Sequence, residues 1–152
     1  MTKVKPPASY DELESYLPYL VNRLASLGQS TQNRMLSANG ISLVFLRTLS
    51  ILHIENGLTI NEIAACTFTE QSSASRAIDA MVSQGLVERR TPEQDQRRRE
   101  IILTDLGCEQ LLRCWPTMDS YFAMLCEGTS QEDRENCRKI LARMLENLAR
   151  QA

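Results

Sequence analysis

The sequence lacks the features that mark membrane proteins and exported proteins. Across its 152 residues, no apolar run approaches the roughly 18–20 residues that are needed to cross a bilayer. The opening MTKVKPPASY has two lysines, but no apolar stretch follows them, as a signal peptide would require. We therefore expect no membrane segment and no signal peptide, and a cytoplasmic location.

Cysteine occurs in a pattern that suits neither disulfides nor a local metal site. The five cysteines are an odd number, and no two of them have C-x-x-C spacing. This pattern argues against a disulfide framework and against a zinc site built from a local motif. We predict no metal and no cofactor, and we expect most of the cysteines, including Cys66, to be small buried side chains.

The sequence also contains little that would serve catalysis. Histidine occurs once, at His53, and there is no P-loop, nucleophile elbow or H-E-x-x-H motif. A His–Cys couple would need Cys66 or another thiol to fold against His53. We interpret His53 as a structural residue, buried or at the edge of the core, and we predict that the protein is not an enzyme.

Positive charge is scarce overall but concentrated in one segment. The formal net charge is −2, yet residues 72–99 hold six arginines against four acidic residues, a net charge of +2. The flanking segments 10–71 and 100–152 each carry −3. The acidic average argues mildly against nucleic acid, but the local cluster favours it.

Hydrophobic spacing predicts a mainly helical chain. Capping boxes begin helices at Ser9 and Thr59, and a regular apolar stripe follows Ser130. Pro18 predicts either a kink or a short helix followed by a longer one. Further helices are expected over about 42–56 and 70–84, with Thr69 as the cap of the latter.

After Gly85 the apolar spacing changes from helical to alternating. LVERRT and REIILT read as two short strands, and the polar loop between them opens with Pro92. That loop is too long for a two-residue turn, so the hairpin should project. Two short helices followed by such a hairpin form the order of a winged helix-turn-helix.

The helix over about 70–84 has the surface of a DNA-recognition helix. Ala74, Ile78, Met81 and Val82 share one face and should point to the core. Short hydroxyl side chains near its N-terminus would let the helix enter a major groove, where amide and guanidinium groups bind base edges or phosphates. An ordinary serine-rich polar face is the alternative. The predicted DNA contacts are Gln71, Ser72, Ser73, Ser75 and Arg76.

The loop of the hairpin, about residues 91–99, supplies the second half of the prediction. Arginines on a projecting hairpin suit phosphate contacts and insertion into a minor groove. The alternative is a surface charge cluster balanced by neighbouring acids. We predict DNA contacts here from Arg89, Arg97, Arg98 and Arg99.

Several motifs in this region resemble those of the MarR family of bacterial transcriptional regulators. They are SR at Ser75–Arg76, GLVER at 85–89, D-x-R from Asp95 to Arg97, and ILT at 102–104 followed by Gly107. The resemblance implies a homodimer whose recognition helices read a palindromic double-stranded DNA site. It further implies that Arg97 enters the minor groove and that Asp95 orients an arginine there. Family members usually repress, and they release DNA when a small phenolic or aromatic acid, or an oxidant, acts on them.

The terminal helices also favour a dimer, independently of the family resemblance. Both carry full apolar stripes that the small winged region cannot cover alone. We expect one intertwined domain with an N-terminal dimerisation region at 1–40, the winged helix-turn-helix at 41–104 and C-terminal dimerisation helices at 105–152. The fold class is thus mainly α with a small β-hairpin wing. The predicted dimerisation residues are Leu17, Leu20, Leu24, Ile140, Leu141, Met144, Leu145 and Leu148.

Two other functions remain open from the sequence. One is a winged helix that binds another protein without DNA, which the acidic average would suit. The other is a thiol-based redox-responsive regulator. The redox-sensing branch of the family places its cysteine in the N-terminal helix, whereas this chain has no cysteine before Cys66. No effector-binding residue can be assigned from the sequence.

Overall fold

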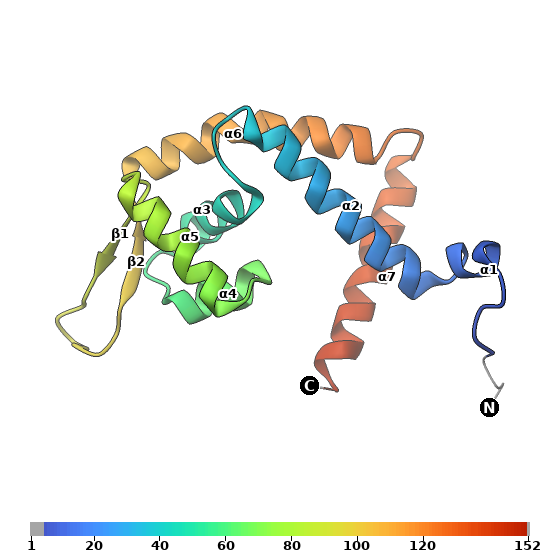
Figure 1. Ribbon diagram of the computed structural model, residues 1–152, viewed down its shortest axis with the longest axis horizontal. Coiled ribbons are helices and arrows are strands. Elements are labelled where there is room, and N and C mark those ends of the chain that lie inside the picture. The colour runs from blue at the N-terminus through green and yellow to red at the C-terminus, as the bar shows by residue number, and fades with distance from the viewer. Residues whose placement is uncertain (1–4, 152) are drawn as a thin grey trace. The chain divides into compact units, whose positions relative to one another are not determined.

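The computed structural model describes residues 5–151 as a helical chain with one small β-hairpin (Figure 1). Its contacts divide it into two compact units, one ending at Thr117 and the other beginning at Met118. Among the described residues, none of the helices combines the length and apolarity that a bilayer crossing demands. In chain order the elements are α1 (Tyr10–Glu14), α2 (Leu17–Ser37), α3 (Leu43–Ile54), α4 (Ile60–Thr67), α5 (Gln71–Ser83), β1 (Val87–Arg90), β2 (Glu100–Leu103), α6 (Asp105–Leu125) and α7 (Gln131–Ala149).

Pro18 lies at the junction between the first two helices and does not kink either of them. The Ser9 hydroxyl accepts the Glu12 backbone N–H, while the Glu12 carboxylate accepts the N–H of Ala8. Pro18 lies in the first turn of α2, where a missing N–H costs nothing because that group would have no partner within the helix. The prediction of a short helix followed by a longer one is confirmed.

The helix-turn-helix is formed by α4 and α5. Thr59 and Glu62 make a complete capping box at the start of α4. The helix ends at Phe68, whose φ of 55° lies in the left-handed region, a conformation that costs about 1–2 kcal/mol for a residue with a Cβ. The expected cap at Thr69 is wrong, because its hydroxyl donates back to the carbonyl of Thr67. The N-cap of α5 is Glu70 instead, and it makes no side-chain capping bond.

The predicted hairpin is confirmed, with each strand one residue shorter at both ends. Val87 pairs with Leu103 and Arg90 with Glu100 in antiparallel register. An isolated bridge between Leu58 and Ile101 adds the segment before α4 to the same sheet. Leu86 leaves the ladder because its N–H donates to Met81 at the end of α5. The wing is therefore attached at its base to both helices of the helix-turn-helix.

The hydrophobic core is built from the winged region together with residues of α2 and α6. The α5 face predicted to be buried is buried at Ala74, Ile78 and Met81, with Val82 half-buried. The rest of the core comes from the segments around it: Leu36, Ile41, Leu43, Leu46, Leu49, Leu52, Leu58, Ile63, Ala64, Leu86, Val87, Ile101, Leu111 and Cys114.

Two expectations about burial are wrong. Only Cys114 is a buried cysteine, whereas Cys66 is exposed, because the inward face of α4 is taken by Ile63, Ala64 and Thr67. His53 is also exposed, since it lies in the last turn of α3, beyond the side chains that pack inward. All five thiols are free.

The terminal helices keep their apolar stripes uncovered. Neither α1 nor α7 has a buried residue, and α2 buries only Gly28 and Leu36. The predicted dimerisation residues are exposed, except for the half-buried Met144: Leu17, Leu20, Leu24, Ile140, Leu141, Leu145 and Leu148.

A glycine allows α6 to start directly against the wing. A Cβ added to Gly107 would lie 2.1 Å from the Leu86 carbonyl oxygen and 2.7 Å from a Leu103 methyl group. The Thr104 hydroxyl completes this junction by donating to the carbonyls of Gly85 and Leu86 while accepting the N–H of Gly107. Because the nearest atom belongs to backbone, a side chain here would push the helix away from the end of α5.

Replacing Gly107 with alanine should therefore destabilise the fold. We expect Gly107→Ala to lower the free energy of unfolding by about 1–3 kcal/mol, as overpacked sites do. Urea denaturation at a fixed protein concentration measures this change. Glu109→Ala, an exposed change two residues along the same helix, should shift it by less than about 0.5 kcal/mol. A Gly107→Ala midpoint equal to that of the control would contradict the packing argument.

Candidate nucleic-acid interface

The N-terminal half of α5 presents small polar groups and one cation. Gln71, Ser72 and Arg76 are exposed, while Ser73 and Ser75 are half-buried. Among the residues that the structure describes, the Arg76 guanidinium donates a hydrogen bond only to the Ser73 hydroxyl, at 3.1 Å. No acidic residue occupies the first turn of α5, but its N-cap, Glu70, places one carboxylate at the positive end of the helix dipole. This surface offers hydrogen-bond donors and one guanidinium group that can bind phosphate.

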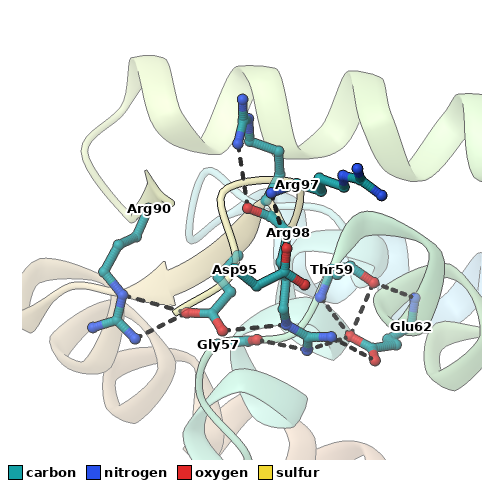
Figure 2. Close-up of polar contacts among 9 residues, drawn as sticks. Gly57, Thr59, Glu62, Arg90, Asp95, Arg97 and Arg98 are labelled. Atoms are coloured by element: carbon teal, nitrogen blue, oxygen red, sulfur yellow. Dashed lines mark hydrogen bonds and ion pairs between the residues drawn. The ribbon is translucent and has the colours of Figure 1, made fainter. Parts of the chain in front are cut away.

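Arg98 holds the wing against the helix-turn-helix (Figure 2). Its guanidinium lies 3.0 Å from the Glu62 carboxylate and 3.2 Å from that of Glu100. It also donates to the backbone carbonyl of Gly57, at 3.2 Å. Glu62 belongs to α4 and Glu100 to β2, so one side chain joins the wing loop to a strand and to a helix. Arg98 is one of the predicted DNA contacts, and in this structure its guanidinium is bound by groups within the chain.

Glu100 and Arg90 extend this network across the hairpin. Arg90 donates from Nε and an amino group to one Glu100 oxygen, while Arg98 binds the other oxygen. The Glu100 side chain is only 14% exposed, so its charge is shielded from water and is neutralised by the two arginines. The positive charges of Arg90 and Arg98 equal the negative charges of Glu62 and Glu100, so the network adds no net charge to the surface.

The electrostatics of Glu62 follow from its contacts. Hydrogen bonds from the backbone and side chain of Thr59, together with Arg98, lower the pKa of Glu62 from its ordinary value of 4.5. The hydrogen bond to Glu62 correspondingly raises the pKa of Arg98. The Glu62 carboxylate therefore serves two purposes, since it caps α4 through Thr59 and anchors the wing through Arg98.

A second ion pair ties the hairpin to the recognition helix. Arg89 on β1 lies 2.5 Å from the carboxylate of Asp79 on α5. Both side chains are largely exposed, so the pair orients the strand more than it stabilises the fold. Arg89, another predicted DNA contact, is thus held by a partner within the chain.

Three cations in this region face no carboxylate among residues 5–151. Arg76 binds only the Ser73 hydroxyl, and Arg99 binds only the carbonyls of Gln96 and Arg98. The Arg97 guanidinium makes no hydrogen bond or ion pair with the described residues, and it extends away from the Arg98 network (Figure 2). Asp95 accepts the Arg97 backbone N–H at 2.9 Å, and so shapes the loop rather than pairing with a guanidinium. The guanidinium groups without a carboxylate partner therefore lie on the outer wing and on α5, and the wing loop also holds the acidic residues Glu93 and Asp95.

Sequence reasoning missed the residues that position this surface. Glu62 was assigned only to a capping box, and Glu100 only to a surface balance of charge. The carbonyl of Gly57, which no sequence motif singles out, is also part of the anchor. Glu62 and Arg98 are 36 residues apart, and no local spacing indicates their contact.

A separate pocket of about 290 Å³ lies between α3 and α6. It is lined mostly by apolar side chains, and His53 contributes an imidazole whose Nδ1 is 3.9 Å from the Cys108 sulfur. Within residues 5–151, no three histidine, cysteine or acidic side chains gather as metal ligands would. The lining residues are Ser50, His53, Ile54, Leu111, Leu112 and Trp115.

The fold is that of a winged helix-turn-helix protein, with arginines exposed on α5 and on the wing. The sequence model of the MarR family matches residues 39–98. The crystal structure of a MarR family transcriptional regulator from Silicibacter pomeroyi DSS is 31% identical with a TM-score of 0.83, and the match covers 95% of this chain and 97% of that one. This chain belongs to the MarR family of transcriptional regulators.

Two further relatives have more specific descriptions. The transcriptional repressor MprA of Escherichia coli (strain K12) is 26% identical over 147 residues, which cover 93% of this chain and 84% of MprA. The crystal structure of an S. aureus MepR–DNA complex is 25% identical with a TM-score of 0.74, and the match covers 89% of this chain and 98% of that one.

The wing anchor predicts a pH-dependent stability difference. Glu62→Gln keeps an oxygen for the α4 cap but removes the charge that binds Arg98. Because the folded-state pKa of Glu62 is lowered, its ionic contribution is present above the ordinary value of 4.5 and is lost as the pH falls through the folded-state value. The wild type should melt at a higher temperature than Glu62→Gln at pH 7, and the gap should shrink in acid.

Thermal melting of both proteins from pH 7 to pH 3 measures this gap. Glu88→Gln on β1 is a matched control, because Glu88 is exposed and forms no ion pair with the described residues. Its melting temperature should follow that of the wild type. A Glu62→Gln gap that does not change with pH would show that the charge of Glu62, which Thr59 and Arg98 bind, does not stabilise the fold.

Proposed function

We propose that this protein is a dimeric, sequence-specific DNA-binding repressor. The proposal depends on which of its arginines form ion pairs with carboxylates of the same chain. Arg89, Arg90 and Arg98 are neutralised within the chain, while Arg76, Arg97 and Arg99 are not. The uncompensated cations lie on the recognition helix and the outer wing, the two elements that bind DNA in a winged helix. The name of the relative MprA and the DNA complex of MepR support the same function.

The way in which the protein docks on DNA follows from which side chains are free to contact it. The α5 N-terminus enters the major groove, where Gln71, Ser72 and Arg76 reach base edges and phosphates. Arg97 extends from the wing into the adjacent minor groove, and Arg99 binds the phosphate backbone beside it. Arg98 acts indirectly, because it holds the wing at the angle that this docking needs. A binding partner other than DNA would have no use for cations divided between these two elements.

In a dimer, the exposed apolar stripes of α2 and α7 would be covered by a second copy of the chain. Leu145 and Leu148 are 66% and 68% exposed, which is unfavourable for a helix in water unless another surface covers it. A second copy of the chain brings a second recognition helix, and two half-sites about one helical turn apart make a palindromic operator.

The pocket between α3 and α6 suits a small effector. Its apolar walls and Trp115 can hold an aromatic ring, and the His53 imidazole at its edge can hydrogen-bond a carboxylate or phenol. We infer that a small aromatic or phenolic acid binds there and releases the repressor from DNA.

Removing the uncompensated arginines should weaken specific DNA binding. Arg76→Ala and Arg97→Ala should each cost about 1–3 kcal/mol and leave the oligomeric state unchanged, because both side chains point to solvent. Fluorescence anisotropy on a duplex that the wild type selects from a randomised library measures the loss. Arg138→Ala removes the same charge from α7 and should bind like the wild type. Wild-type affinity in both test variants would refute the assignment of the interface.

The dimer interface is tested by placing charge on its stripe. The double variant Leu141→Glu and Leu145→Glu should be monomeric, because two carboxylates cannot be buried there without partners. Light scattering over a concentration series gives the mass. Lys139→Glu places the same charge near the opposite side of α7 and should remain dimeric. If the double variant stays dimeric, the stripe of α7 is not the interface.

A further inference from the structure

The turn between α4 and α5 contains a residue that its backbone disfavours. Phe68 is the only non-glycine residue among those described whose φ is positive. Its N–H donates to Ala65 and the next N–H donates to Ala64, which completes the end of α4. These are backbone bonds, so glycine or asparagine would make them equally well and with less crowding at Cβ.

The side chain of Phe68 does not stabilise the core in return. It is 89% exposed, and the inward face of α4 is already filled by Ile63, Ala64 and Thr67. A large aromatic group in water, on a turn that prefers a smaller residue, is unfavourable for folding on both counts. Such a residue points to a role in binding.

Its position indicates which surface it serves. Phe68 lies three residues before Gln71, the first residue of α5. In a helix-turn-helix, that end of the second helix approaches the base edges. Phe68 therefore places an exposed apolar group in the turn that leads directly into the polar N-terminal end of α5.

We propose that Phe68 is a specificity-determining residue that contacts a thymine methyl group at the edge of the half-site read by α5. This proposal rests on the proposed DNA-binding function. In the major groove, the thymine C5-methyl is the apolar group that a phenyl ring can cover, and the other bases present hydrogen-bonding groups there. An apolar contact of this kind favours thymine at one position in each half-site.

Removing single thymine methyl groups from the DNA tests the contact directly. Thymines of the duplex selected by the wild type are replaced one at a time by deoxyuridine, which lacks only the methyl group. Wild type, Phe68→Gly and Phe68→Asn are then compared by anisotropy. We expect the wild type to lose about 3- to 10-fold in affinity at one thymine per half-site, as burial of a methyl-sized group predicts. Both variants should bind the unmodified duplex more weakly by a similar factor and be insensitive to that replacement.

Thermal melting separates binding from folding. Both variants should melt at or above the wild-type temperature, because they relieve the left-handed strain. Wild-type affinity in the variants, an unchanged deoxyuridine response, or a fall in melting temperature would overturn the role of Phe68 while leaving the DNA-binding function standing. If the wild type selects no sequence at all, the proposed function fails, and the role of Phe68 fails with it.

Discussion

The position of the wing depends on the contacts of Arg98. The hairpin is only two strands of four residues, which is too small to hold a fixed orientation by itself. Arg98 joins its loop to Glu62 at the start of α4, to Glu100 on β2 and to the carbonyl of Gly57. Because Glu62 also caps α4, the orientation of the wing and the start of the helix-turn-helix are set by the same carboxylate. The outer arginines can then project from a defined base.

The local part of this fold could be predicted from the sequence, and the long-range part could not. The capping box at Thr59, the inward face of α5 and the two strands depend on neighbours within a few residues, and all were confirmed. The contact between Glu62 and Arg98 joins residues that lie far apart in the chain. For the same reason, sequence could not decide which arginines would be neutralised. Cys66 was misjudged because its hydrophobicity does not reveal which face of a short helix it occupies.

In the proposed function, the arginines have two roles. Those paired with carboxylates hold the wing to its neighbours, and those without a carboxylate partner among the described residues would bind phosphate. In the proposed dimer, the uncovered stripes on α2 and α7 would pack together, and two joined units would read two half-sites. Specificity would then have two sources, hydrogen bonding from α5 and the apolar ring of Phe68.

We propose that the arginines without a carboxylate partner bind the phosphates of a specific duplex. Wild-type fluorescence anisotropy on the selected duplex and on a scrambled one, across a series of salt concentrations, tests this proposal. We expect tighter binding to the selected duplex, two protomers per duplex, and an affinity that falls steeply as salt rises because counterions are released. Equal affinity for both duplexes, with little dependence on salt, would contradict it.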